Sequence, residues 1–427
     1  MFEKVKQLTE SCSCGKKHTL MTEEFAVEKD AHLLMAEYLK KHGYTSPAVI
    51  CDENTHVFTH DITKSIDVKA VLTVSGKAHA TEVFAADAED FIRKHSPDVL
   101  IACGSGSVHD ITRYAAHTMD VPFVSYPTAA SVDGYVSGVA AMTWYGQKLT
   151  FEAVPPKAVF ASPEVFVTAP ERLTASGVGD VLGKYNSLFD WNVGRIFTGE
   201  YYCPEIAAIT REAVDETVEA IKRRADISKE EYTTKVMYAL LLSGLAMQLA
   251  GNSRPASGAE HHMSHLWEMH LMNEEVDALH GEKVAVGLNI VADTYKKALL
   301  RGLDYEKIGR IELEKVFEKG RISPVFGELT EPTLKENLPD GTLSSSSLAK
   351  IKLDDIDRIN KELAEAAGVL PEADEIINLC TLADVPVKPS DVGLPSDEEF
   401  IKKSLKYAPY VRNRITLLKI LSAADII

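Results

Sequence analysis

Short, uninterrupted apolar runs separated by helical patterns constrain the fold of the first part of this chain more than any other feature. The runs are Pro47–Cys51, Val68–Val74, Asp98–Cys103 and Val121–Tyr126, with further β-prone sequence over Lys148–Phe160. Strands with one solvent-exposed face alternate apolar and polar residues, whereas continuous apolar runs are typical of parallel strands covered by helices on both faces. Helical patterns at residues 28–41 and 86–94 precede and separate these runs. The sequence therefore predicts an α/β domain built on a parallel sheet.

The pattern changes near Pro170, where strand-like runs almost vanish and long helical patterns such as Pro204–Arg224 and Glu230–Leu249 take over. A chain of 427 residues is longer than one hydrophobic core usually serves. We therefore expect an α/β domain over residues 1–169 and an all-helical domain over residues 170–427. Within the second, Ser323–Ser347 contains three prolines and a run of serines and is predicted to be a surface excursion between helices.

Composition and charge exclude several classes of protein. Hydrophobic residues make up 45% and charged residues 26%, which is ordinary for a globular protein and too apolar for a disordered one. The formal net charge is −17, with the acidic residues spread along the chain, so that nucleic acid is not an expected partner. No apolar stretch has the length of a membrane span and the first residues do not resemble a signal peptide. We expect no membrane partner and a cytoplasmic location.

The six cysteines do not look like a disulfide framework in a chain of this length. Cys12, Cys14 and His18 form a C-x-C-x3-H pattern of the metal-binding type, but no fourth ligand is evident from the sequence. The favoured interpretation is therefore a surface loop with reduced thiols, and no role is assigned to this cluster. Cys51 and Cys103 each end an apolar run and are expected to be small core residues.

A glycine-rich turn follows the third strand, with the sequence Gly104-Ser-Gly-Ser107, and a helix is predicted from Val108. A tight turn between a strand and a helix lets backbone N–H groups approach a pyrophosphate, and the helix dipole favours the negative charge. His109 stands where the usual dinucleotide fingerprint has its third glycine. Nucleotide binding and a plain turn therefore both remain open on this feature alone.

A second segment of small residues, Pro127-Thr-Ala-Ala-Ser131, follows the next strand and leads to Asp133 and Gly134. Ligands of parallel sheets bind at the carboxyl ends of the strands, and small residues there let a flat ring or a phosphate lie against the backbone. The alternative is a plain small-residue turn in which Asp133 caps a helix.

The helical part carries a group of polar residues that suits a metal ion. Asp180 and Lys184 lie one helical turn apart, and this spacing alone also fits an ordinary ion pair. His261 and His265 share a helical face, and His280 begins a further predicted helix. Two histidines from separate helices and one carboxylate are a common ligand set for a divalent metal with open positions. The H-E-x-x-H motif is absent, which argues against a metalloprotease.

In this order the motifs resemble the superfamily that joins dehydroquinate synthase, glycerol dehydrogenase and the iron-activated alcohol dehydrogenases. Within it the chain looks closest to the sn-glycerol-1-phosphate dehydrogenases, the bacterial ones in particular. The resemblance extends to the closing Tyr407–Leu418. Its most specific pieces are Pro127–Ser131 with Asp133, Gly179-Asp180, Glu260-His261 with Ser264-His265, and His280–Lys283.

The resemblance implies a dehydroquinate synthase-like fold, in which a Rossmann-like α/β domain binds the dinucleotide and the helical domain binds metal and substrate. It implies that Asp180, His261 and His280 are the metal ligands, and that Asp180 and His265 are catalytic. Asp133, Asp180, Lys184 and His265 would bind the substrate. The implied cofactor contacts are Asp52, Gly104, Ser105, Gly106, Ser107, Val108, Thr128, Ala129, Ala130, Ser131 and Ser137.

Two departures from the family pattern affect these assignments. Ser105 replaces the middle glycine of the turn, and its N–H group is still available. The doublet His261-His262 leaves the ligand register open, since glycerol dehydrogenases align so as to favour the second histidine. His261 is preferred because it is spaced one helical turn from His265.

The implied reaction is the NAD-linked reduction of dihydroxyacetone phosphate to sn-glycerol 1-phosphate, with NADP as the alternative cofactor and zinc, nickel or iron as the metal. A small phosphorylated triose or polyol is thus the expected partner molecule, and a homo-oligomer such as a dimer is expected. The alternatives are a glycerol or polyol dehydrogenase acting on an unphosphorylated substrate, a cyclising lyase like dehydroquinate synthase, and a non-catalytic metal-binding protein.

Overall fold

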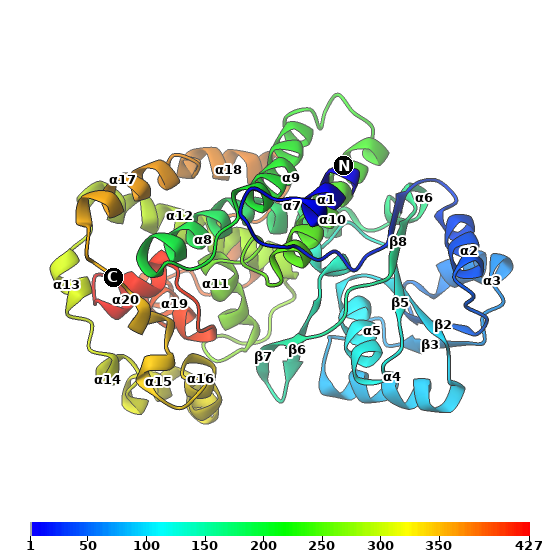
Figure 1. Ribbon diagram of the computed structural model, residues 1–427, viewed down its shortest axis with the longest axis horizontal. Helices are drawn as coiled ribbons and strands as arrows, with labels where there is room; N and C mark the ends of the chain where they lie inside the picture. Colours follow the sequence, from blue (N-terminus) through cyan, green and yellow to red (C-terminus); the bar gives the residue numbers. More distant parts are fainter. Residues whose placement is uncertain (1) are drawn as a thin grey trace. The chain divides into compact units, whose positions relative to one another are not determined.

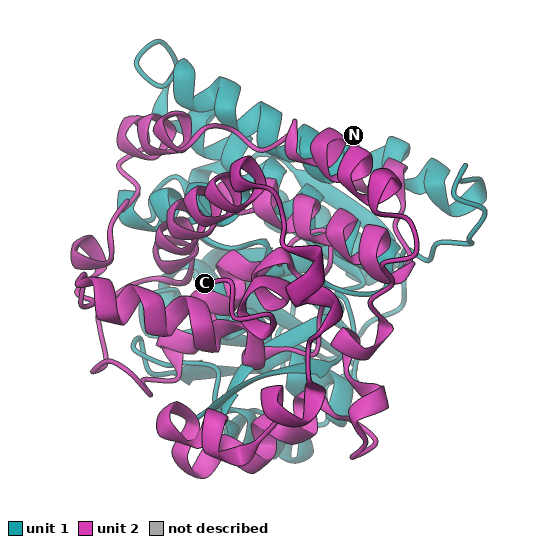
Figure 2. Ribbon diagram, turned by 90° about the vertical axis from the view of Figure 1, so that its left-hand side faces the viewer, with its two compact units in different colours: residues 1–181, 208–253 teal, residues 182–207, 254–427 magenta. Residues whose placement is uncertain are grey.

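The computed structural model describes residues 2–427, and the chain divides into two compact units (Figure 2). Unit 1 comprises Met1–Val181 and Ala208–Ser253, and unit 2 comprises Leu182–Ala207 and Arg254–Ile427. The division falls inside two continuous helices, α7 (Glu171–Leu182) and α9 (Pro204–Lys222), each of which contributes residues to both units. The predicted boundary at residue 169 differs from this grouping, which assigns residues 170–181 and 208–253 to the α/β unit.

Unit 1 contains a six-stranded sheet in the order β1-β8-β5-β4-β2-β3, and all of its pairings are parallel. The strands are β1 (Glu24–Val27), β2 (Pro47–Asp52), β3 (Ala70–Val74), β4 (Val99–Gly104), β5 (Phe123–Pro127) and β8 (Ala158–Ala161). An antiparallel pair, β6 (Val139–Trp144) and β7 (Gln147–Glu152), stands apart from it. The parallel α/β fold that the apolar runs predict is confirmed.

Helices cover both faces of the sheet, which explains why its central strands are mostly apolar (Figure 1). All six residues of β2 and of β4 are buried. Alternate strand residues belong to two separate cores. Ile50 and Ala102 pack with helices α4 (Glu82–His95) and α5 (Gly106–Thr118), whereas Val49 and Ile101 pack with α2 (Ala31–Lys41) and α3 (Thr59–Ser65). The sheet is therefore the central layer of three.

The order in which strands are added to the sheet reverses between β2 and β4. From β2 it passes through α3 to β3 on one side, and from β4 through α5 to β5 on the other. Open parallel sheets bind ligands at the carboxyl ends of the strands at such a switch point. The register pairs Cys51 with Cys103, so Asp52 and Gly104, which end these two strands, lie side by side there.

The remaining helices of unit 1 are α1 (Phe2–Glu10), α6 (Pro163–Phe166), the shared α7 and α9, and α10 (Lys229–Ala250). Helix α10 groups with the α/β unit because it packs against the 3-10 turn η2 (Asp133–Val136). A Cβ atom on Gly244 would lie 2.7 Å from the Asp133 carbonyl oxygen, so only glycine permits this approach. The side-chain amide of Gln248 also donates to the Val136 carbonyl.

Unit 2 is helical throughout its two segments, 182–207 and 254–427, all of which the structure describes. Besides its part of α9, its helices are α8 (Lys184–Thr198), α11 (Ala259–Glu268), α12 (His280–Arg301), α13 (Tyr305–Gly309), α14 (Leu313–Val316), α15 (Lys319–Phe326), α16 (Thr330–Asn337), α17 (Ile356–Ala367), α18 (Ala373–Leu382), α19 (Glu398–Tyr407) and α20 (Leu417–Ala423). Across residues 2–427, no helix combines the length and apolar character needed to cross a membrane.

The segment Ser323–Ser347, which is predicted to be a surface excursion between helices, is largely exposed or half-buried but contains a helix of its own, α16. Asn337 at the end of α16 is fully buried, donates to the Tyr410 carbonyl at 2.6 Å and accepts from the Lys419 ammonium at 2.6 Å. These bonds to the C-terminal segment order a stretch whose prolines suggested a loop.

Candidate active site

The glycine turn lies at the switch point of the sheet. Strand β4 ends at Gly104 and α5 begins at Gly106, so the first N–H groups of the helix face the carboxyl edge of the sheet. A Cβ atom on Gly104 would approach the Val108 side chain to 2.6 Å, which explains why this position has no side chain. Ser105, Gly106 and Ser107 are partly exposed and therefore accessible to a ligand.

His109 is buried beneath the glycine turn and stabilises it through hydrogen bonds. Its Nδ1 lies 3.0 Å from the Ser105 carbonyl oxygen and its Nε2 lies 2.7 Å from the Ser125 hydroxyl. Burial, and then the charge of Arg113, lower the pKa of His109 to about 3, so the ring is neutral. Since a carbonyl can only accept, Nδ1 carries the proton and Nε2 accepts from Ser125. The residue that departs from the dinucleotide fingerprint is thus a core histidine that holds the turn.

Asp52 lies at the end of β2 and is almost buried, at 8% exposure. Its Oδ1 accepts from the backbone N–H groups of Asn54 and Thr55 at 2.8 and 2.9 Å, and from the Thr55 hydroxyl at 3.0 Å. The same hydroxyl lies 3.0 Å from the Cys103 carbonyl oxygen. The carboxylate is therefore held beside the glycine turn, where a ribose hydroxyl of a dinucleotide would reach it.

The segment Thr128–Ser131 is buried and lies next to the glycine turn, because the Thr128 N–H donates to the Gly104 carbonyl at 3.0 Å. Tyr135 fixes its far end through its hydroxyl, which donates to the Ala129 carbonyl and lies 2.9 Å from the Ser131 hydroxyl. A Cβ atom on Gly177 of α7 would lie 2.1 Å from the Ala130 carbonyl oxygen. The absence of a side chain on Gly177 thus allows α7 to pack directly on the segment.

Asp133 and Asp180 meet through this packing. The Asp133 N–H donates to Asp180 Oδ2 at 2.9 Å, and Asp133 Oδ2 accepts from the Ser243 hydroxyl at 2.9 Å. Asp180 is fully buried in the last turn of α7. Ser137 is also buried, and its hydroxyl is occupied by the Val139 carbonyl at 2.9 Å.

The histidines of α11 and α12 come together because the two helices approach closely. Gly287 makes this possible, since a Cβ atom there would lie 2.6 Å from the Glu260 carbonyl oxygen. The ring centroids of His261 and His280 are 5.3 Å apart, and those of His265 and His280 are 5.7 Å apart. Asp180, His261 and His280 each offer a ligand atom, and these atoms lie within 4.8 Å of one another.

Two glutamates that the sequence analysis missed orient these histidines. His261 Nδ1 lies 2.7 Å from Glu260 Oε1, and His280 Nδ1 lies 2.9 Å from Glu268 Oε1. A carboxylate that accepts from Nδ1 leaves the Nε2 lone pair for a metal and makes the imidazole a stronger ligand. Burial works to raise the pKa of Glu260, but hydrogen bonds from His261, Asn186 and the Gly258 N–H bring it below the ordinary value. Glu260 is therefore ionised when it accepts from His261.

His262 occupies a different environment from its neighbour. It is fully buried, and its two ring nitrogens have no hydrogen-bond partner. Burial, followed by the charges of Arg414 and Arg412, lowers the pKa of His262 well below its ordinary value. His265 is not grouped with Asp180 and His261. Its ligand atom lies within 4.8 Å of those of Glu268 and His280. It is thus a neighbour of the Asp180–His261–His280 group.

Lys184, one of the predicted substrate contacts, is the first residue of α8 and is fully buried. A concentration of positive charge that the sequence analysis missed lies instead in the C-terminal segment. Burial and the charges of Arg254 and Arg412 lower the pKa of Arg414 to about 9, and Arg412 and Arg414 remain partly exposed. Burial is the largest cause of this shift, and the carboxylates of Glu200 and Glu336 oppose the repulsion from the neighbouring cations.

The described residues include a dinucleotide-type turn and a group of side chains that could hold one divalent ion. One carboxylate and two imidazoles, the latter each oriented by a further carboxylate, fit a metal that retains open positions for a substrate. Such an ion polarises a carbonyl or hydroxyl oxygen. These features together suit redox chemistry on a small oxygen-bearing molecule.

Comparisons with known proteins identify the relatives of this chain. A family model described as iron-containing alcohol dehydrogenase matches residues 26–170. The chain is 32% identical to a glycerol-1-phosphate dehydrogenase (NAD(P)+) of Bacillus licheniformis over 430 residues, covering 98% of this chain and 93% of that protein. It is 38% identical to the protein of the same name from Bacillus subtilis over 290 residues, covering 65% of this chain and 73% of that protein.

Among solved structures, a probable glycerol dehydrogenase from Sinorhizobium meliloti superposes with a TM-score of 0.62 at 17% identity, covering 95% of this chain and 96% of that one. At that identity the likeness concerns the fold alone. It confirms the predicted fold class, an α/β nucleotide-binding part followed by a helical part.

Proposed function

Because this chain belongs to the glycerol-1-phosphate dehydrogenase family, we propose that it reduces dihydroxyacetone phosphate to sn-glycerol 1-phosphate with a nicotinamide cofactor and a divalent metal. The relatives are named glycerol-1-phosphate dehydrogenase (NAD(P)+), and the family model is described as iron-containing alcohol dehydrogenase. NAD is the proposed cofactor, with NADP as the alternative, and zinc, nickel and iron all suit the proposed ligands.

The observation that carries the proposal is the pair of histidines whose Nδ1 atoms face glutamates, beside a buried aspartate. Asp180, His261 and His280 are the proposed metal ligands, and a bound ion would supply Lewis acidity at the ketone oxygen. Asp180 is held in place by the N–H group of Asp133. His265, one helical turn beyond His261, is the proposed donor of the proton that the alcohol product requires.

The cofactor contacts of the proposal follow the carboxyl edge of the sheet. The N–H groups at the start of α5 would bind the pyrophosphate, and Asp52 would accept from the adenosine ribose. The buried segment Thr128–Ser131 would support the nicotinamide end with its backbone. The remaining proposed contacts are Gly104, Ser105, Gly106, Ser107, Val108 and Ser137.

The substrate phosphate needs a cation in a protein whose net charge is −17. Arg412 and Arg414 are the proposed source, because an anion would offset the repulsion that Arg412 exerts on Arg414. Arg412 also feels the charge of Glu268, the partner of His280. Lys184, the amides near Asp133 and His265 remain proposed contacts from the sequence. A charge-assisted bond to phosphate contributes about 1.5–3 kcal/mol.

The proposal is tested with metal-free protein that is reloaded with one metal at a time. NADH oxidation with dihydroxyacetone phosphate should be absent in the metal-free protein and restored by a divalent ion, and the product should be the sn-1 enantiomer. The sn-3 enantiomer, or turnover that is independent of metal, would contradict the proposal. Arg412→Ala should raise the KM for dihydroxyacetone phosphate while leaving the KM for NADH unchanged, and Arg358→Ala is the matched control.

A further inference from the structure

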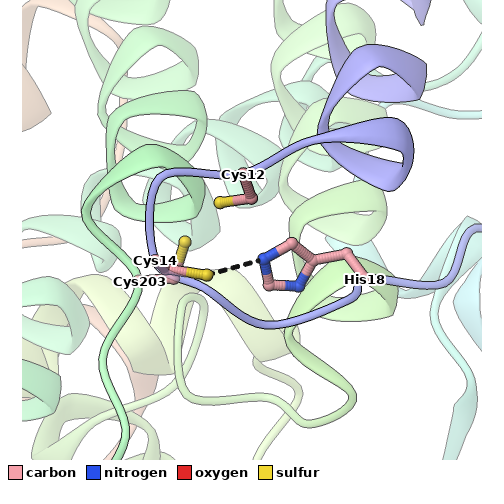
Figure 3. A group of neighbouring side chains, drawn as sticks. All are labelled: Cys12, Cys14, His18 and Cys203. Atoms are coloured by element: carbon pink, nitrogen blue, oxygen red, sulfur yellow. Dashed lines mark hydrogen bonds between the residues drawn. The ribbon is translucent and has the colours of Figure 1, made fainter.

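A second group of metal-type side chains lies in the loop between α1 and β1, where the sequence shows Cys12, Cys14 and His18. The structure adds a fourth member, Cys203, from far along the chain. All four ligand atoms lie within 4.8 Å of one another, and Figure 3 shows the three thiols and the imidazole converging. We propose that these residues bind a structural zinc ion. The loop lies at the surface as expected, and Cys203 is the fourth member that the sequence did not reveal.

The loop is shaped so that its first two thiols face the same point. The Gly15 N–H donates to the Cys12 carbonyl at 3.2 Å, which closes a tight turn around Cys14. Gly15 has a φ of +76°, in the left-handed region that favours glycine. The chain therefore turns back so that the Lys16 N–H lies 3.4 Å from the Cys14 sulfur. An N–H group that donates to sulfur stabilises the thiolate form, which is the form that binds metal.

His18 is oriented as a metal ligand. Its ring is buried, at 3% exposure, and its Nδ1 lies 2.7 Å from the Leu249 carbonyl oxygen in the last turn of α10. Because a carbonyl only accepts, Nδ1 carries the proton and the Nε2 lone pair faces Cys14 Sγ, which is 3.2 Å away. Metal-bound histidines generally make such a bond through their other ring nitrogen.

The segment after His18 is fixed in place by the neighbouring residue of α10. Gln248 accepts from the Met21 N–H at 3.0 Å and donates to the Thr22 hydroxyl at 2.8 Å. The imidazole therefore does not depend on a metal for its position, and the group is preorganised.

Cys203 reaches the group from the start of α9. It is buried, directly precedes Pro204, and its sulfur accepts from the Ile206 N–H at 3.5 Å. The N-terminus of a helix stabilises a thiolate through the helix dipole. The fourth ligand thus comes from a second rigid element.

Three sulfurs and one imidazole nitrogen form a complete tetrahedral set for zinc and leave no position for a substrate. This distinguishes the group from Asp180, His261 and His280, whose oxygen and nitrogen donors leave positions open. Binding releases the protons of those thiols that are not already ionised. The zinc would join the N-terminal loop to the start of α9, and the proposal does not depend on the proposed function.

The test measures zinc in the full-length chain after expression with zinc and removal of loosely bound ions. His261→Ala serves as background, because it removes the proposed catalytic metal. This variant should retain a single zinc ion per chain, and adding Cys14→Ser or Cys203→Ala should abolish it. Cys380→Ala, which removes another buried thiol, is the matched control and should leave the zinc content unchanged.

A cobalt-loaded His261→Ala chain provides a readout that does not require a cysteine variant to fold. It should show thiolate-to-cobalt charge-transfer bands, and X-ray absorption of the zinc form should give sulfur at about 2.3 Å and nitrogen at about 2.0–2.1 Å. Absence of the charge-transfer bands, or zinc content that is unaffected by the loss of Cys14, would overturn the proposal. A disulfide among Cys12, Cys14 and Cys203 in freshly isolated protein would also overturn it.

Discussion

Glu260→Gln tests whether the orienting carboxylates matter to the metal. Three donors converge on Glu260: His261 Nδ1 at 2.7 Å and the Gly258 N–H at 2.7 Å on Oε1, and the Asn186 amide on Oε2. Glutamine has one acceptor oxygen, so at least one of these donors must face an NH2 group. A hydrogen bond to a charged group contributes about 1.5–3 kcal/mol, and loss of a ligand's orienting partner typically costs 10–100-fold in metal affinity.

The two magnitudes agree, since each tenfold change corresponds to about 1.4 kcal/mol. We therefore expect the metal dissociation constant of Glu260→Gln to rise by about 10–100-fold. Calorimetric titration of metal-free protein measures it, in a Cys14→Ser background that removes the other proposed site. Glu362→Gln is the control, because that carboxylate pairs with Arg195 and Arg358 rather than with a histidine. Unchanged metal affinity in a folded Glu260→Gln protein would refute the reasoning.

The other predictions concern single residues of the site. His261→Ala should lose metal, whereas His265→Ala should keep metal and lose turnover. Elemental analysis measures the metal content and an NADH assay measures the turnover. Metal loss in His265→Ala alone would reverse the assignment. Asp52→Asn keeps an acceptor for the turn but removes the charge, so the preference for NAD over NADP should weaken; an unchanged ratio of kcat/KM values would remove Asp52 from this role. The pKa of His109 falls from 6.5 to about 3 on folding, so its contribution to stability is present above pH 6.5 and is lost as the pH falls from there toward 3. The difference in Tm between the wild type and His109→Asn should therefore shrink over that range, and a constant difference would contradict it.

The α/β half of the fold could be predicted from the sequence because its signals are local. A parallel strand that is buried on both faces is predominantly apolar, and β2 up to Cys51 and β4 up to Cys103 are apolar at every position. Gly104 marks the turn because nothing larger fits against Val108. Strand β1 has only four residues, and its apolar run of three is too short to predict a strand. Its place beside β8 depends on pairing that the sequence does not reveal.

The groups that complete the sites were harder to predict because they come from distant segments. Cys203 joins the cysteine loop only through folding, and Arg412 and Arg414 reach the surroundings of His262 from the end of the chain. Glu260 is next to His261 in the sequence, but its role is visible only in the bond between them. His109 departs from the dinucleotide-binding fingerprint, and the sequence gives no reason for it. Its burial in the structure shows that it is a core residue.

The most direct test of the proposed function compares two ketones that differ only in the phosphate. Purified protein with metal and NADH should reduce dihydroxyacetone phosphate with a kcat/KM on the order of a hundredfold or more above that for dihydroxyacetone, as expected for the loss of one or two charge-assisted bonds. The comparison also distinguishes the alternative of a polyol dehydrogenase. Comparable kcat/KM values for the two ketones would contradict the phosphate specificity and favour that alternative.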